Sequence, residues 1–152
     1  MMTLGLAFHT LAAVIWVGGM FFAHLVLRPS AGALDAQTRL ALWERVLRRF
    51  FAWVWLSIAA LLVSGFAMVM IGFGGFASLA HYISVMMAVG IIMVMLFAHV
   101  YFAPWRRFRH AVAAANWTEA EGNIRQIRKL VTVNLLLGLV TVVVGASGRY
   151  FG

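Results

Sequence analysis

Three stretches of the chain contain no Asp, Glu, Lys or Arg, and they constrain the fold more than any other feature of the sequence. They cover residues 1–27, 50–105 and 130–148. About 20 apolar residues are enough for a helix to cross the hydrocarbon core of a bilayer. The first and third stretches are each long enough for one membrane span, and the middle stretch is long enough for two.

A turn divides the middle stretch at Gly72-Phe73-Gly74-Gly75, because glycine-rich segments end regular structure. Hydrophobic residues make up 64% of the chain and charged residues 11%, whereas soluble proteins carry about 25% charged residues. The sequence therefore predicts an all-α membrane protein with one transmembrane domain, a four-helix bundle over residues 1–152. Its spans are expected near residues 4–27, 50–71, 78–103 and 130–148. No positive charge precedes Arg28, so the first span is expected to be retained and not to be a signal peptide.

The basic residues gather in the first and third connections between spans, and the second connection has none. Lys and Arg accumulate on the cytoplasmic side of a membrane. We therefore expect a multi-pass protein of the bacterial inner membrane with cytoplasmic basic loops and both termini in the periplasm. The net charge of +8 is attributed to this topology and to attraction toward anionic lipid, and no nucleic-acid partner is expected. The basic residues of the two connections are Arg28, Arg39, Arg45, Arg48, Arg49, Arg106, Arg107, Arg109, Arg125, Arg128 and Lys129.

Both basic connections also carry signals of helix starts. Thr118 followed by Glu121 fits a capping box, and Asp35 is placed to cap a helix that continues into the second span. These segments are expected to lie in the membrane interface as continuations of the second and fourth spans.

The chain contains a weak internal repeat. Phe22-Ala23-His24-Leu25 precedes Pro29, and Phe97-Ala98-His99-Val100 precedes Pro104. The pattern indicates two duplicated helix hairpins, related by an axis along the membrane normal, with both ends of the chain outside. Chance similarity of apolar segments is the alternative.

Four histidines lie in the predicted spans, where ionisable groups are costly and usually functional. His9 and His24 belong to the first span, and His81 and His99 belong to the third. Because these two spans run in the same direction, His9 and His81 share the outer level and His24 and His99 share the inner level. Two imidazoles at one level on neighbouring helices are what a haem b iron requires.

The leading hypothesis is a b-type cytochrome with one haem b held by His24 and His99, and a second haem at His9 and His81 as an extension. Arg28, Arg48 and Arg106 near the inner level would bind the haem propionates, because guanidinium pairs well with carboxylate. Trp16, between the two levels, would pack on a macrocycle or lie between two redox centres, and plain core packing is the alternative. The alternative for each histidine is a hydrogen-bonded side chain in the core.

Copper binding is the second kind of site that the residue types allow. The chain has nine Met and no Cys, and thioether and imidazole groups together suit Cu(I). Most of these methionines are equally well explained as flexible core residues.

The first span resembles a known family. His9 followed by Trp16-Val17-Gly18-Gly19-Met20-Phe21 is similar to the opening of the CopD/HemJ superfamily of small bacterial membrane proteins. The run from His81 through His99 to Arg106-Arg107 is similar to it too, and the chain resembles single-domain CopD-like proteins.

The resemblance implies two functions, copper movement from periplasm to cytoplasm for CopD and haem-dependent oxidation of protoporphyrinogen IX for HemJ. HemJ proteins carry a Lys shortly after the His that starts the third span, whereas Tyr82, Ile83, Ser84 and Val85 follow His81 here. This departure argues against protoporphyrinogen oxidation.

The functional expectation is therefore a haem b protein acting in electron transfer, or a membrane oxidoreductase, with a redox protein or a quinone-like molecule as partner besides the lipid bilayer. Copper transport is the alternative, and a structural protein is the third class. A homo-oligomer is compatible with all three.

Overall fold

Four long helices make up the protein. The computed structural model describes residues 2–72, 74–76 and 79–150. The four helical rods run over Met2–Ala31, Ala36–Gly72, His81–Ala113 and Trp117–Ser147, and each is long and apolar enough to cross a membrane. The predicted all-α fold with four spans is thus confirmed.

Each rod consists of one or more helical elements. The first combines α1, the π-helical segment η1 and α2, and the second combines α3 with a second π-helical segment, η2. The third is divided into α4 and α5, because Pro104 cannot continue the helix and Ala103 leaves helical geometry before it. The elements are α1 (Met2–Phe22), η1 (Ala23–Leu27), α2 (Arg28–Ala31), α3 (Ala36–Ala67), η2 (Met68–Gly72), α4 (His81–Phe102), α5 (Pro104–Ala113), α6 (Trp117–Ser147) and the short η4 (Gly148–Tyr150).

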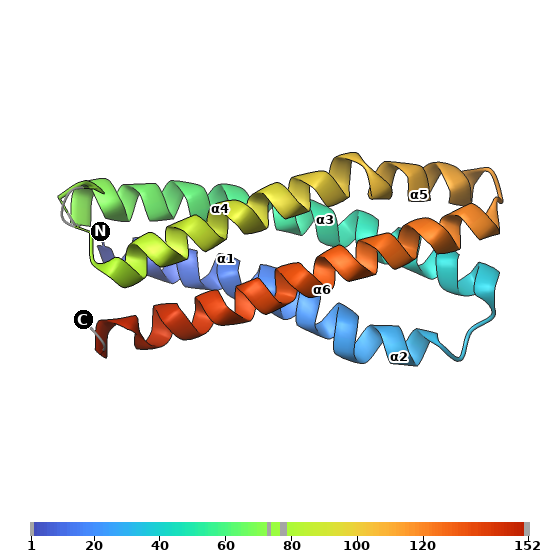
Figure 1. Ribbon diagram of the computed structural model, residues 1–152, viewed down its shortest axis with the longest axis horizontal. Coiled ribbons are helices and arrows are strands. Elements are labelled where there is room, and N and C mark those ends of the chain that lie inside the picture. The colour runs from blue at the N-terminus through green and yellow to red at the C-terminus, as the bar shows by residue number, and fades with distance from the viewer. Residues whose placement is uncertain (1, 73, 77–78, 151–152) are drawn as a thin grey trace.

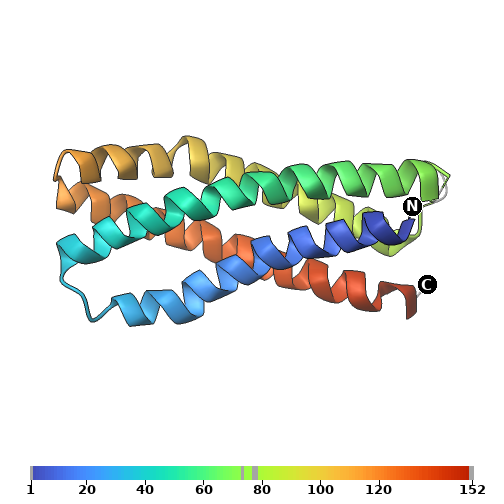
Figure 2. The same ribbon diagram turned by 180° about the vertical axis from the view of Figure 1, so that it is seen from behind.

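The rods form two antiparallel hairpins that cross each other. The first hairpin pairs α1 with α3, and the second pairs α4 and α5 with α6 (Figures 1 and 2). Both termini lie at one end of the bundle, here named the terminal end, and the two basic connections lie at the other, named the basic end. This arrangement is the one that the charge pattern predicts.

The predicted glycine turn joins the two hairpins at the terminal end. Gly74 and Gly75 have φ angles of 73° and 99°, which side chains with a Cβ rarely adopt. Phe73, in the same predicted turn, lies outside the described residues. The turn is confirmed at Gly74 and Gly75, whereas Gly72 is the last residue of η2.

The spans differ from prediction mainly at the basic end, where the helices are longer. Residues 36–49 of α3 and 117–129 of α6 add about 20 Å of helix each to the charge-free spans. A headgroup layer is only about 5–8 Å thick on each side of the hydrocarbon. These segments therefore extend out of the membrane, and we name them, together with α5, the basic extension.

The basic extension has a well-packed apolar core. Leu40 of α3, Phe108 of α5 and Ile124 of α6 are each 1% exposed or less. Trp105 and Ala111 are buried on the same face of α5 as Phe108, while the arginines of α5 are exposed. The predicted helical continuations are thus present, and they pack on one another through their apolar faces. This packing is favourable because it removes apolar side chains from water.

Asp35 caps the start of α3 as the sequence predicts. Its Oδ1 accepts a hydrogen bond of 3.0 Å from the Thr38 backbone N–H. Hydrogen bonds from the side chain and from the backbone N–H of Thr38 favour the charged carboxylate and hold the pKa of Asp35 below its ordinary value. The cap fixes where the second rod leaves the basic loop.

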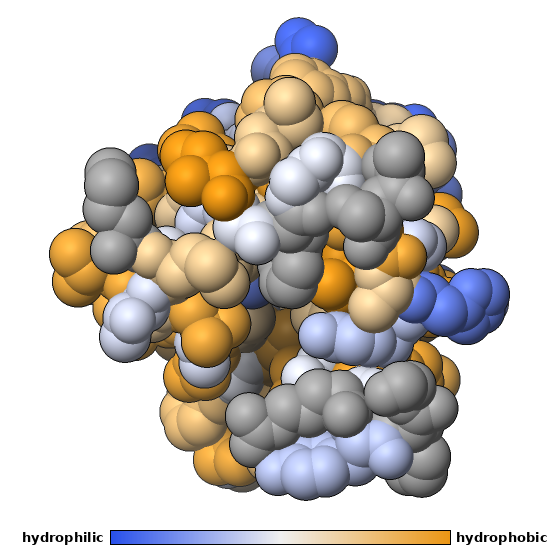
Figure 3. Space-filling view, turned by 90° about the vertical axis from the view of Figure 1, so that its left-hand side faces the viewer, coloured by the Kyte–Doolittle hydropathy of each residue, from blue (hydrophilic) through white to orange (hydrophobic). Residues whose placement is uncertain are grey.

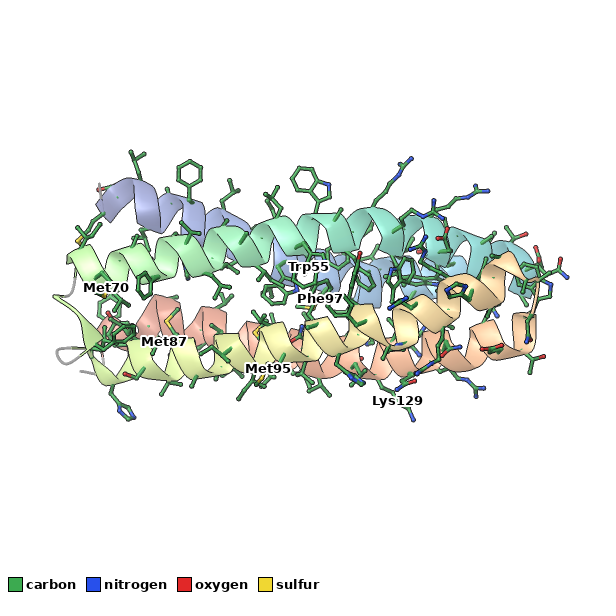
Figure 4. All side chains as sticks on the ribbon, turned by 90° about the horizontal axis from the view of Figure 1, so that it is seen from above. Trp55, Met70, Met87, Met95, Phe97 and Lys129 are labelled. Carbon is green, nitrogen blue, oxygen red and sulfur yellow. The ribbon has the colours of Figure 1, made fainter. Side chains whose placement is uncertain are left out.

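Aromatic side chains fill the middle of the bundle. Phe97 of α4 meets Trp55 of α3 with ring centroids 5.3 Å apart, and the two face each other across the bundle in Figure 4. Phe51 lies 5.3 Å and Trp16 6.2 Å from the same ring in edge-to-face contact. This aromatic cluster joins the two hairpins.

The part of the bundle toward the terminal end exposes many apolar side chains. Val63 and Ile71 are both 72% exposed. The view onto the terminal end shows orange apolar side chains reaching the outside of the bundle (Figure 3). Lipid tails are as apolar as these side chains, so burial against protein is not needed there.

Candidate functional site

The structure does not bring His24 and His99 together inside the bundle. The ring of His24 is half-buried, and its Nδ1 lies 3.4 Å from Thr132 Oγ1 of α6. The ring of His99 is exposed on the outside of α4. One iron held between both imidazoles does not fit this arrangement.

Helical periodicity explains why His99 points outward. Met93, Phe97 and Val100 are the buried residues of α4, and His99 lies about 200° around the helix from Phe97. His24 lies in η1, where the wider π-helical turn changes the direction in which side chains leave the helix axis. The two histidines hold the same position before a proline but face in different directions.

The outer pair is not brought together in the interior either. His81, the first residue of α4, is exposed, whereas His9 is half-buried against α3. In addition, no group of three or more His, Asp or Glu side chains gathers at a metal-binding distance in the part of the chain that the structure describes.

The other residues expected to hold haem have different surroundings. Arg28 and Arg106 are exposed at the basic end, and Arg48 pairs with Glu44 at 2.6 Å. Trp16 is 3% exposed and packs in the aromatic cluster. Its ring lies against Phe97 of α4, with centroids 6.2 Å apart, so these two side chains meet where a macrocycle would have to lie. Haem b at these residues stays a prediction that the geometry does not favour.

His9 is held by a shorter side-chain contact within the bundle than the one His24 makes. Its Nδ1 lies 3.0 Å from the Oγ of Ser64, which is 8% exposed on α3. The single hydroxyl proton of Ser64 is donated to the backbone oxygen of Ala60. With that proton given to Ala60, Ser64 Oγ is left to accept from His9, and the tautomer with its proton on Nδ1 would leave a lone pair on Nε2. A histidine that binds a metal is oriented in this way by the bond at its other nitrogen.

Two methionines continue the line from His9 to the terminal end. The side chain of Met68 packs against Gly5, and that of Met2 packs against Gly72. On α1, positions 2, 5 and 9 share one face, and on the second rod, positions 64, 68 and 72 share the facing one. We name this line of Met2, Met68, Ser64 and His9 the soft seam.

The soft seam depends on small residues and on an irregular helix. A Cβ on Gly65 would lie 3.3 Å from the His9 ring, so glycine lets the ring lie against the α3 backbone. Met68 and Met70 belong to η2, and π-helical segments are frequent at functional sites. Figure 4 shows Met70 and Met87 in the region between the two hairpins near the terminal end. Thioether groups therefore gather at this end.

Two polar residues of the interior were not singled out by the sequence. For Ser64, the available signal was a small polar residue among apolar ones. Asn134 of α6 is 4% exposed, and its amide oxygen has no hydrogen-bond partner among the described residues. It is one of the few polar residues of the last charge-free stretch, which again was the available signal.

Comparison with known families agrees with the architecture of a multi-pass all-α membrane protein. The family model of copper resistance protein D, CopD, matches residues 44–147. The match covers more than half of the chain, and the chain belongs to the CopD family. Neither a curated protein nor a solved structure matches it. The match begins at residue 44, so Met2 and His9 of the soft seam lie outside the matched residues.

Proposed function

We propose that the protein moves copper ions across the bacterial inner membrane, and that the soft seam is where copper enters. Membership of the copper-resistance family supports this function over the others that the sequence allows. The observation that carries the site is the contact of His9 Nδ1 with Ser64 Oγ, which orients the imidazole, with Met68 packed against Gly5 one turn away on α1.

The chemistry of the seam suits monovalent copper. Thioether and imidazole ligands favour Cu(I), whereas the hard carboxylate and water ligands preferred by Mg²⁺ or Ca²⁺ are not part of the seam. Met68 and His9 lie about one helical turn apart along the rods, so a copper ion would pass between them in short steps. Weak ligands spaced in this way allow an ion to bind and to leave.

Beyond the seam, the interior offers further soft groups. Met20 and Met93 are 2% and 3% exposed, and the Met93 methyl group lies against Gly138. Asn134 lies one turn from Gly138 toward the basic end. A route from the seam past these residues is the proposed path, with the terminal end in the periplasm and the basic end in the cytoplasm.

The test is Cu(I) binding and uptake by the purified protein in liposomes, with copper kept reduced and with Ag(I) as a redox-inert probe. The variants His9→Gln, Met68→Leu and Ser64→Ala are expected to lower Cu(I) affinity by about tenfold or more, since they remove a ligand or its orienting bond. Exposed His99→Gln and Met95→Leu are the matched controls and should behave like the wild type. Equal behaviour of all five variants would exclude the soft seam.

The same preparation tests the haem hypothesis. If His24 and His99 hold the iron, protein expressed with ample haem should show a Soret band, and His24→Ala and His99→Ala should each abolish it. We expect no stoichiometric haem, because the two rings do not converge. A Soret band at one haem per chain, with copper absent, would replace the copper proposal by the cytochrome.

A further inference from the structure

The outer face of α6 carries a hollow of about 290 Å³ at the basic end. It is lined by Gly122, Arg125, Gln126 and Lys129. Gly122 keeps the hollow open, since a Cβ there would meet nothing within 4 Å. In Figure 4, Lys129 points away from the bundle, toward the surroundings of the protein. The hollow thus has two cationic side chains, one amide and open space.

The cations of the hollow differ from most of the basic residues around them. Glu44 pairs with Arg48 and Arg109, and Glu121 pairs with Arg39 and Arg128. Among the described residues, Lys129 has no ion-pair partner, and Arg125 bonds only to the backbone oxygen of Glu121, at 3.3 Å. Both charges are therefore free to bind an anion.

The hollow lies at the depth of lipid phosphate groups. Lys129 is the last charged residue before the charge-free stretch 130–148, which at about 28 Å matches the thickness of the hydrocarbon core. Arg125 lies one turn farther out, about 6 Å along the helix. This distance is within the headgroup layer, whereas the start of α6 is beyond it.

An apolar stripe continues from the hollow along the same face of α6. Val133, Leu136, Val140 and Val143 are between 48% and 64% exposed and follow Lys129 at helical spacing. The face is therefore cationic where headgroups lie and apolar where acyl chains lie. One phospholipid matches both parts.

We propose that this face of α6 is a binding site for one anionic phospholipid. Its phosphate lies between Arg125 and Lys129, the Gln126 amide donates to the headgroup, and an acyl chain follows the stripe from Val133. Gln126 is held in place by Arg107 of α5, whose guanidinium donates to Gln126 Oε1 at 3.0 Å and so leaves the Gln126 amide N–H₂ free. The site is independent of copper and of the soft seam.

A matched control exists in the first hairpin. Arg45 and Arg49 of α3 have the same charge and the same four-residue spacing, and Arg49 likewise directly precedes a charge-free stretch. Both are exposed. However, Leu42 and Val46 stand three residues before and one residue after Arg45, where Gly122 and Gln126 stand around Arg125, so this pair lacks the open space and the amide.

The experiment measures lipid retained by the protein, by native mass spectrometry after extraction from nanodiscs of mixed phosphatidylglycerol and phosphatidylcholine. The wild type should retain one phosphatidylglycerol, and R125Q/K129Q should lower this retention about tenfold or more, as expected for the loss of two charges near a lipid surface. Gly122→Leu keeps every charge and fills the hollow, and it should lower retention to a similar extent. The control R45Q/R49Q should retain lipid like the wild type.

Three outcomes would overturn the proposal. Equal losses in R125Q/K129Q and R45Q/R49Q would mean general attraction to anionic lipid without a site. Full retention in Gly122→Leu would mean that the hollow is not used. Displacement of the lipid by excess inorganic phosphate would assign the cations to a soluble anion. Cu(I) binding, measured on the same variants, should stay at the wild-type level, so failure here and failure of the copper proposal are distinguishable.

Discussion

Gly18 and Gly19 are neighbours on α1, but only Gly19 is in close contact with another helix. The ring of Phe50 from α3 occupies the place where a Cβ of Gly19 would lie, whereas nothing lies within 4 Å of that place at Gly18. Close approach of the first two rods near the basic end therefore depends on one glycine of the pair. The Trp-Val-Gly-Gly segment that carries the family resemblance has a packing role at Gly19.

Alanine at each glycine tests this difference. Gly19→Ala should destabilise the protein by about 1–3 kcal/mol, the usual cost of overpacking, because the Phe50 ring must move. Gly18→Ala is the control and should be neutral or slightly stabilising, since alanine favours helix. Thermal unfolding in detergent, followed by circular dichroism, measures both. Equal melting temperatures for the two variants would contradict the packing role.

Among the elements, the basic extension is held together differently from the spans. Its helices bury apolar faces against each other in water, while the spans toward the terminal end leave large side chains to the lipid. Helix pairing in the extension is therefore expected to supply much of the stability of the folded bundle.

Two phenylalanines test this contrast. Phe108 of α5 is fully buried in the extension, and Phe8 of α1 is 62% exposed on a span. Phe108→Ala should cost about 3–5 kcal/mol, as for other buried phenylalanines, and Phe8→Ala should cost far less. Chemical unfolding in detergent micelles provides the measurement. A larger loss for Phe8→Ala would place the main stabilising contacts in the membrane.

The elements could be predicted from the sequence to different degrees. Charge-free stretches set the number of helices, and Gly74-Gly75 and Asp35 set a turn and a helix start, because each depends on local chemistry. The direction of His24 could not be predicted, since a π-helical segment changes the side-chain register without a sequence signal that identifies it. The outward direction of His99 depends on which face of α4 meets the other hairpin, and that is decided by tertiary packing.

For the whole molecule, the separation of charge between its two ends predicts its orientation. The basic end carries both arginine-rich connections and should be cytoplasmic by the positive-inside rule. Because the chain has no native cysteine, single cysteines can report the side of each end without background. Ala80 and Ala114 are exposed at opposite ends of the bundle.

A membrane-impermeant maleimide applied to spheroplasts should label Ala80→Cys and leave Ala114→Cys unlabelled until the membrane is permeabilised. Labelling by a permeant maleimide controls for the reactivity of both positions. The reverse pattern would invert the topology and would reverse the direction of the proposed copper movement.

The candidate site was predictable only in part at this scale. The sequence identified His9, thioether groups and copper chemistry, since residue types alone indicate them. It could not pair His9 with Ser64, because residues 55 positions apart meet only after the first hairpin forms.

The second and fourth rods pass from the aqueous extension into lipid without a break. The second rod is a stiff helix held near its middle by Phe51 and Trp55 of the aromatic cluster. If this rod pivots there, its two ends move in opposite directions, so that widening one end of the bundle narrows the other. An event near Arg39 would in this way reach Met68, more than 40 Å away at about 1.5 Å per residue, with no relay of side chains between them.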